Sequence, residues 1–98
     1  MHTLYRVVNF NIEEDYILWV EFDDGSSQVI DFEPVLAGEV YGPLNDLDLF
    51  NQVRLDPESD NLIWPNDAEF DPADLHDWPE VAQEFEEWAK SLELTDIR

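Results

Sequence analysis

The fold is decided by residues 16–32, which read YILWVEFDDGSSQVIDF. Two runs rich in β-branched and aromatic residues flank an Asp-Gly pair. This pattern is typical of a β-hairpin, because the turn positions must tolerate positive φ. With Asp24-Gly25 as a two-residue loop, Val20 lies opposite Val29, and Trp19 lies opposite Ile30.

This register assigns the apolar residues of the hairpin to two faces. One face carries Ile17, Trp19, Ile30 and Phe32, and the other carries Leu18, Val20, Phe22 and Val29. Both faces are substantially apolar, so we expect a helix or loop to cover at least part of the second face.

Shorter elements are expected on either side of the hairpin. Residues 4–10, 53–55 and 62–64 predict three further strands, and the last two are joined by a run rich in turn formers. Residues 33–38 predict a turn or short helical piece, followed by a brief extended segment at 39–41. Asn45 or Asp46 predicts the cap of a short helix that runs to Asn51.

From Asp77 onward the apolar period changes to that of a helix. Asp77 and Glu80 have the spacing of a capping box, and Pro79 lies early in the helix, where a missing N–H is tolerated. One continuous stripe is formed by Trp78, Val81, Ala82, Phe85, Trp88, Ala89 and Leu92. This stripe predicts an amphipathic helix whose apolar face belongs to the core.

The predicted fold class is α+β, with a small antiparallel sheet of four to five strands, short helices and one C-terminal amphipathic helix. We expect residues 1–98 to form one domain, with a sheet-rich part at about 4–64 and the helix at about 78–92. Hydrophobic residues make up 44% of the chain, and four Trp, three Tyr and six Phe supply bulky core material against the disorder that high charge favours.

The formal net charge is −21, with 25 acidic residues against four Lys and Arg. Such an excess keeps a protein soluble and attracts cationic partners. It argues against direct contact with nucleic acid, which needs clustered Lys and Arg, and against anionic membranes. The chain has no cysteine and no apolar run of signal-peptide or membrane-spanning length, so we expect a cytoplasmic protein.

Two groups of acids are candidate metal ligands. Asp56, Glu58, Asp60 and Asp67 occupy positions 1, 3, 5 and 12 of a loop resembling an EF-hand, but Asn61 replaces its glycine and the flanks read as strands. The second group is Asp67, Glu69, Asp71 and Asp74. A solvated acidic loop is the alternative for both groups, and no cofactor is predicted.

No arrangement of residues predicts catalysis. His76 has no partner motif, so a packing or surface role is expected for it. The serines lie outside any nucleophile-elbow context, and the glycines form no phosphate-binding loop. We therefore expect a protein that is not an enzyme.

Each of the four tryptophans can belong either to the hydrophobic core or to a surface that contacts a partner. Trp19 and Trp88 lie on predicted core faces. Trp64 and Trp78 lie near the ends of elements, where an aromatic side chain can anchor a partner, although core packing is favoured for both. The candidate partner-binding residues are Trp64, Asp67, Glu69, Asp71, Asp74 and Trp78.

The chain resembles the domain of unknown function 2442 family of small bacterial α+β proteins. Three stretches in this order carry the resemblance: Phe22-Asp23-Asp24-Gly25-Ser26 with Val29-Ile30-Asp31-Phe32; Gly42-Pro43-Leu44-Asn45-Asp46 with Leu49-Phe50; and Ile63-Trp64-Pro65-Asn66 with Phe70-Asp71-Pro72 and Leu75. Where relatives commonly have Gly-Ala-Asp after Trp-Pro-Asn, this chain has Asp67-Ala68-Glu69.

The resemblance implies an antiparallel sheet with helices and no established activity or catalytic residues. Some relatives carry a fused helix-turn-helix domain, which is not expected here because only one helix follows Leu75. The resemblance to other relatives implies action beside a small toxin-like partner, as its antitoxin.

Three functions stay open from the residues. The first is binding of a basic protein partner, including a toxin-like one. The second is binding of a divalent cation, and the third is mimicry of nucleic-acid charge. The alternative to all three is that the acidic residues have no binding function and serve only solubility or adaptation to a salty cytosol.

Overall fold

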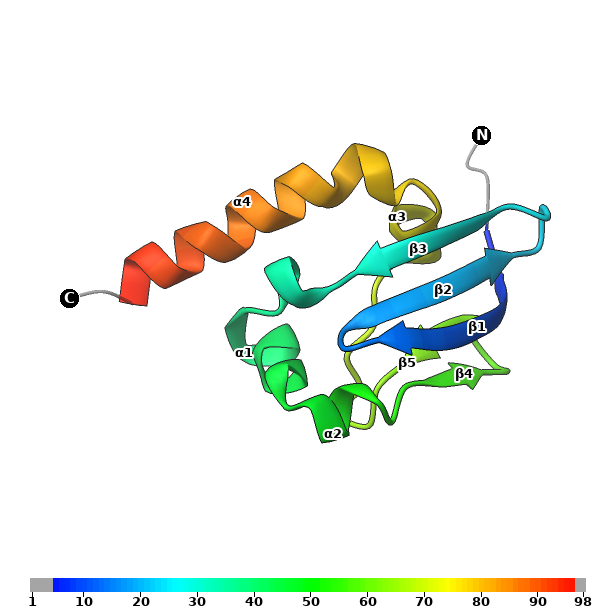
Figure 1. Ribbon diagram of the computed structural model, residues 1–98, viewed down its shortest axis with the longest axis horizontal. Coiled ribbons are helices and arrows are strands. Elements are labelled where there is room, and N and C mark those ends of the chain that lie inside the picture. The colour runs from blue at the N-terminus through cyan, green and yellow to red at the C-terminus, as the bar shows by residue number, and fades with distance from the viewer. Residues whose placement is uncertain (1–4, 97–98) are drawn as a thin grey trace.

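The computed structural model describes residues 5–96, with side chains through Leu92. Three strands form one antiparallel sheet in the order β1-β2-β3, and two shorter strands form a second antiparallel sheet. The strands are β1 (Val7–Glu14), β2 (Ile17–Phe22), β3 (Ser27–Asp31), β4 (Arg54–Asp56) and β5 (Asn61–Ile63). The predicted α+β class is confirmed, and all five expected strands are present (Figure 1).

Six helical segments complete the chain. They are η1 (Glu33–Val35), α1 (Gly38–Tyr41), η2 (Gly42–Asn45), α2 (Leu47–Phe50), α3 (Pro72–His76) and α4 (Trp78–Asp96). The predicted cap of α2 is confirmed, because the Asp46 carboxylate accepts a hydrogen bond from the Asp48 N–H at 3.0 Å. The extended segment expected at 39–41 is wrong, since those residues form α1.

The predicted hairpin is present, but its register is one residue away from the expected one. Trp19 pairs with Val29, and Leu18 pairs with Ile30. The loop has three residues, because the Gly25 N–H bonds to the Phe22 carbonyl at 3.0 Å and the Phe22 N–H bonds to the Ser26 carbonyl at 2.9 Å. Gly25 has φ +87°, as in a type I turn followed by a bulge.

This register gathers the bulky apolar side chains on one face of the sheet. Ile30 and Phe32 join Leu18, Val20 and Phe22, and all five are at most 1% exposed. Val29 turns to the opposite face and is 64% exposed. A shift by one residue exchanges the faces of a whole strand, so the loop length determines which residues of β3 enter the core.

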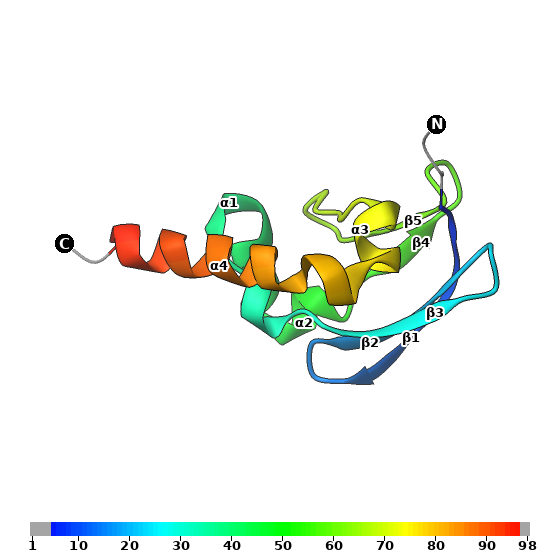
Figure 2. The same ribbon diagram turned by 90° about the horizontal axis from the view of Figure 1, so that it is seen from above.

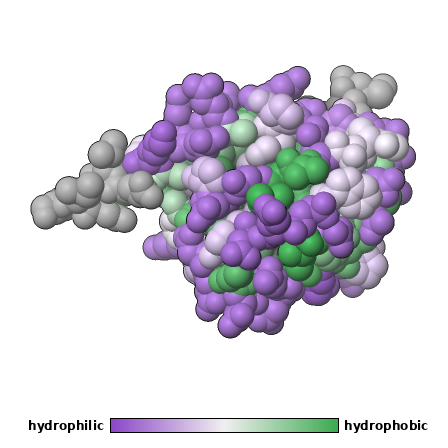
Figure 3. All heavy atoms as spheres, viewed as in Figure 1, coloured by the Kyte–Doolittle hydropathy of each residue, from purple (hydrophilic) through white to green (hydrophobic). Residues whose placement is uncertain are grey.

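The helices lie on one side of the three-stranded sheet. Figure 2 shows α3, α4 and the β4–β5 sheet on that side, while the opposite face of the three-stranded sheet is open. The face that carries Leu18, Val20 and Phe22 is covered, as expected for part of the second face. The open face is that of Trp19, so the prediction that Trp19 lies on a core face is wrong. In Figure 3 apolar patches interrupt the hydrophilic surface of this open face, where Val29 is exposed and Trp19 is half-buried.

The core is an aromatic cluster between the sheet and the helices. Phe32 lies at its centre, with ring centroids 5.2–5.9 Å from those of Phe50, Trp64, Phe70 and Trp78. Trp64 also donates from its indole nitrogen to the Phe50 carbonyl at 2.9 Å. Buried aromatic rings therefore join α2 and the start of α4 to the residues that directly follow β3 and β5.

Helix α4 begins at Trp78 as expected, although the predicted capping box differs from the structure. The Asp77 carbonyl accepts from the Glu80 N–H at 2.8 Å. The Asp77 carboxylate lies 2.8 Å from His76 Nδ1. The imidazole thus takes the place that a backbone N–H would have in a capping box.

Candidate functional site

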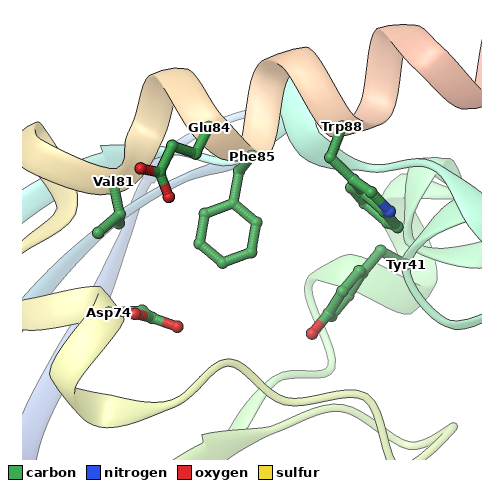
Figure 4. Close-up of a pocket in the computed structure, with 6 residues that line it drawn as sticks. All are labelled: Tyr41, Asp74, Val81, Glu84, Phe85 and Trp88. Atoms are coloured by element: carbon green, nitrogen blue, oxygen red, sulfur yellow. The ribbon is translucent and has the colours of Figure 1, made fainter.

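The candidate site is a pocket of about 330 Å³ between α1, α3 and α4. It is lined by Tyr41, Asp74, Val81, Glu84, Phe85 and Trp88. Figure 4 shows the carboxylates of Asp74 and Glu84 on one side of the pocket, Tyr41 and Trp88 on the other, and Phe85 between them. The pocket thus has an acidic side and an aromatic side.

Helix α4 supplies four of the six lining residues because of their spacing. Val81, Glu84, Phe85 and Trp88 lie at i, i+3, i+4 and i+7, which places them on one face of a helix. The first turn of this helix is anchored by Trp78, which is 7% exposed and stacks on Phe85 with centroids 5.3 Å apart. The anchored turn sets the direction in which the Phe85 ring points.

Tyr41 is held in place from three directions. Its hydroxyl donates to the Glu69 carbonyl at 2.8 Å, its ring stacks on Phe70 at 4.3 Å, and it meets Trp88 edge to face at 6.1 Å. The neighbouring Val40 carbonyl accepts from the Asn66 side chain at 3.0 Å. These contacts fix α1 against the loop that precedes α3.

Gly38 allows α1 to approach α4 closely. It has φ +83°, a conformation that side chains other than hydrogen disfavour. A Cβ atom at this position would lie 3.2 Å from Leu92 Cδ1 and 3.5 Å from the Trp88 ring. Glycine therefore gives Trp88 the space to stand against α1.

Asp74 is presented by α3, a helix of a little over one turn. The helix begins with Pro72, and the Asp71 carboxylate caps it by accepting from the Ala73 N–H at 2.9 Å. Leu75, on the other side of the helix, is 1% exposed and anchors it to the core. The half-buried Asp74 side chain is thereby held at the pocket.

Electrostatics around the pocket are unfavourable to further negative charge. Burial raises the pKa of the Asp74 carboxyl, and the charges of Asp71, Asp77 and Glu84 raise it further. The pKa of the Tyr41 hydroxyl is raised in the same way, first by burial and then by Asp74 and Glu69. We call Glu69, Asp71, Asp74, Asp77 and Glu84 the acidic rim.

The acidic rim has no basic side chain from lysine or arginine to balance it. Within the described part of the chain, the ion pairs are Arg6 with Asp60 at 3.7 Å and His76 with Asp24 and Asp77 at 2.8 Å each. Only Asp77 of the rim takes part in one of them. The pocket therefore lies in a region of uncompensated negative charge.

His76 links the hairpin loop to the junction of α3 and α4. Its two ring nitrogens lie 2.8 Å from the carboxylates of Asp24 and Asp77, and its ring stacks on Tyr5 at 3.7 Å. The hydrogen bond to Asp77 raises the pKa of His76, partial burial opposes this, and Asp24 adds to the rise. The pKa of Asp24 is lowered to about 2 by hydrogen bonds from Ser26 and then His76. This arrangement gives His76 a packing role.

The predicted partner-binding residues separate into two groups. Asp67, Glu69 and Asp71 are exposed, and Asp74 lines the pocket. Trp64 and Trp78 are 2% and 7% exposed, so burial removes both from the surface that a partner can contact. Core packing, which the sequence analysis favoured for both tryptophans, is therefore what the structure shows, and their candidacy as partner anchors is wrong.

The pocket also contains residues that sequence reasoning assigned elsewhere. Trp88 was expected in the core but is 39% exposed. Phe85 and Val81 are on the expected helical stripe yet are only partly buried. Tyr41 and Glu84 carried no signal in the sequence, because neither belongs to a motif and they become neighbours only when α1 packs near α4.

The candidate metal ligands Asp56, Asp60 and Asp67 lie in two different turns of the backbone. Asp56 accepts from the Glu58 N–H at 3.1 Å and from the Ser59 hydroxyl at 3.2 Å in the β4–β5 connection, and Asp60 faces Arg6. Asp67 lies in a different turn, closed by its N–H to the Trp64 carbonyl at 2.9 Å. Among the described residues, no group of three or more His, Asp or Glu side chains is arranged to hold a metal ion.

The helices of the described residues do not meet the requirements of a membrane span. None of the helices formed by residues 5–96 combines the length and apolar character that crossing a bilayer requires.

Comparison with known proteins identifies the family. No match to the chain was found among curated proteins or among solved structures. The model of the family described as "Protein of unknown function (DUF2442)" matches residues 7–79, about three quarters of the chain. The matched residues include Tyr41 and Asp74 of the pocket but end at Pro79, so most of α4 lies outside them. The chain belongs to this family of proteins of unknown function.

Proposed function

We propose that this chain is a non-enzymatic, cytoplasmic interaction protein of bacteria that binds a basic protein partner through the pocket and its acidic rim. The observation that carries the proposal is the half-buried Asp74 carboxylate, whose neighbours include other carboxylates and which, among the described residues, forms no ion pair with a lysine or arginine. A basic surface docked here would supply the missing cations.

A protein that uses negative charge only for solubility does not need a half-buried carboxylate beside other carboxylates, as found at Asp74. Carboxylates that only solubilise a protein are most favourable when fully hydrated and far apart. Here burial and neighbouring acids both raise the pKa of Asp74, which means that its charged form is held at a cost in free energy. A cationic partner would remove this cost, so the arrangement favours binding.

A toxin-like protein is the kind of basic partner that the family resemblance supports. The excess of carboxylates on this chain fits such a partner. The interaction would be steered by long-range attraction, because a net charge of −21 raises the rate of encounter with a cation at low ionic strength.

The first experiment identifies the partner by site-specific crosslinking in the source cells. A photo-crosslinking amino acid is placed at Glu80, on the first turn of α4, and in a parallel strain at Val29, on the open sheet face. A basic protein captured from position 80 and absent from position 29 is the expected result. Capture of the same protein from both positions would contradict a site at the pocket.

The second experiment measures the association rate of the purified partner at low and high salt. Asp71→Asn, Asp74→Asn and Glu84→Gln are combined in one variant, and Glu13→Gln, Glu14→Gln and Asp15→Asn in a control variant with the same change of charge at the β1–β2 turn. We expect roughly tenfold slower association for the rim variant and a much smaller effect for the control. A rate indifferent to salt, or equal loss in both variants, would refute the proposal.

A further inference from the structure

The pocket combines an aromatic surface with an acidic surface. Tyr41, Phe85 and Trp88 supply aromatic rings, while Asp74 and Glu84 point carboxylates into the same space (Figure 4). Aromatic rings carry negative charge on their faces and attract cations, and this attraction grows as water is excluded. Both surfaces therefore select a positively charged group.

The carboxylates narrow the choice of cation. Asp74 is half-buried, so a ligand that covers it must also donate hydrogen bonds to it, or the bound carboxylate loses its water without replacement. A quaternary ammonium group has no N–H and cannot do this. Divalent metals need several oxygen ligands, and no group of three acidic side chains within the described residues is arranged to provide them.

Between the two basic side chains, the geometry favours arginine over lysine. A guanidinium group is planar, is more weakly hydrated than an ammonium group, stacks on aromatic rings and presents five N–H donors in a fixed fork. It can donate to Asp74 and Glu84 together while its flat face lies on Phe85. The methylene stem can lie along the aromatic side of the pocket, at Tyr41 and Trp88.

We propose that the pocket receives the guanidinium group of an arginine side chain presented by the basic protein partner. This inference rests on the proposed function and names the group by which the partner is anchored. A second copy of this chain is disfavoured as the source, because each copy carries a net charge of −21 and the two would repel each other.

The test uses the full chain and three blocked tripeptides, Gly-Arg-Gly, Gly-Lys-Gly and Gly-citrulline-Gly, at equal ionic strength. Citrulline has nearly the shape of arginine but no charge. Binding is followed by calorimetry and by the NMR signal of the Trp88 indole N–H. We expect the arginine peptide to bind with a dissociation constant on the order of millimolar, roughly fivefold more tightly than the lysine peptide, with no saturable binding of the citrulline peptide.

Two variants locate the peptide. Glu84→Gln changes an exposed residue and leaves the fold intact, and Trp88→Leu removes the aromatic wall. Each is expected to weaken binding of the arginine peptide roughly fivefold or more, whereas Glu13→Gln, on β1, leaves it unchanged. Circular dichroism checks that each variant is folded.

Each outcome decides the inference separately from the proposed function. Equal binding of arginine and citrulline, equal binding of arginine and lysine, or arginine binding that survives both pocket variants would overturn the inference. If the rim variant still slows association of the protein partner in that case, the proposed function stands. If the arginine peptide binds at the pocket but the partner ignores the rim, the proposed function fails and the pocket chemistry remains.

Discussion

Two aromatic regions of this molecule differ in how completely they are covered. In the core, Trp64 is 2% exposed, donates its indole N–H to the Phe50 carbonyl and is surrounded by rings from several elements. At the pocket, Trp88 is 39% exposed and has ring contact with Tyr41 on one side. The difference shows that an aromatic side chain is fully buried only where several elements surround it, and not where one element contacts it on one side.

The two regions also differ in their relation to charge. The core cluster is shielded from the acidic residues by the sheet and helices, whereas the pocket rings share their hollow with Asp74 and Glu84. Tight burial serves stability, and partial burial beside carboxylates leaves a surface on which a cation can dock. The following predictions test this contrast, beginning with the largest expected effect.

Replacing Trp64 by Ala should cost about 3–5 kcal/mol in the free energy of unfolding, because it empties a large core volume and removes the buried hydrogen bond from the indole to the Phe50 carbonyl. Replacing Trp88 by Ala should cost only about 1 kcal/mol, since the side chain is partly hydrated already. Urea unfolding measures both values. Similar losses for the two variants would erase the distinction between the core and the pocket.

Replacing Gly38 by Ala should cost about 2–3 kcal/mol, from the strain of φ +83° and from the contact of the new Cβ with Leu92 and Trp88. Gly25→Ala is the matched control, because Gly25 has φ +87° but no neighbouring atom within 4 Å. It should cost about 1–2 kcal/mol from strain alone. Only Gly38→Ala should shift the NMR signal of the Trp88 indole, and a shift in both variants would contradict the close approach of α1 to α4.

The stabilisation provided by His76 should depend on pH. Because its pKa is raised in the folded state, first by Asp77, the contribution of the charged form is complete below the unfolded value of 6.5 and is lost as pH rises through the folded value. The difference in unfolding free energy between the native protein and His76→Gln should therefore shrink from about pH 6 to pH 9. A constant difference would mean that stacking on Tyr5, and not the paired carboxylates, accounts for the role of His76.

At acidic pH the partner Asp24 sets a separate limit. Its pKa of about 2 lies below the usual 3.8, so its contribution is present above pH 3.8 and is lost as pH falls toward 2. Asp24→Asn should remove this loss.

The smallest effect is expected at Asp67, in the loop beside the pocket. This residue has φ +67°, a conformation that glycine adopts without strain and that aspartate tolerates better than most other residues. Asp67→Gly should change stability by less than about 0.5 kcal/mol, since relief of strain offsets the greater freedom of the unfolded chain. Asp67→Val should cost about 1–2 kcal/mol, and thermal unfolding distinguishes the two.

Much of the fold could be predicted because its signals are local. The period of Trp78, Val81 and Phe85 predicts α4, and Asp46 predicts the start of α2. The Asp24-Gly25 pair predicts the hairpin, but its loop has three residues, and this single difference places Ile30 and Phe32 on the face of Leu18 and Val20 instead of the face of Trp19. Turn signals identify a hairpin more reliably than they fix its loop length, because Asp-Gly fits both kinds of loop.

The candidate site was predictable only in part. Asp74 was named from the acidic run, since charge density is visible in the sequence. Its neighbours Tyr41 and Glu84 are 33 and 10 positions away, and no spacing rule joins them. Core packing was favoured for Trp64 and is what the structure shows, whereas Trp88, expected on a core face, is 39% exposed, because exposure depends on which other elements cover a residue.

The sequence by itself determined the α+β class, the order of the strands, the presence of α2 and α4, and the excess of carboxylates, because each follows from residue type and short-range period. The tertiary structure alone decided which tryptophan is buried and which acids surround an aromatic hollow. Burial and electrostatic potential are sums over neighbours in space, and the packing of α1 and α3 against α4 brings those neighbours together.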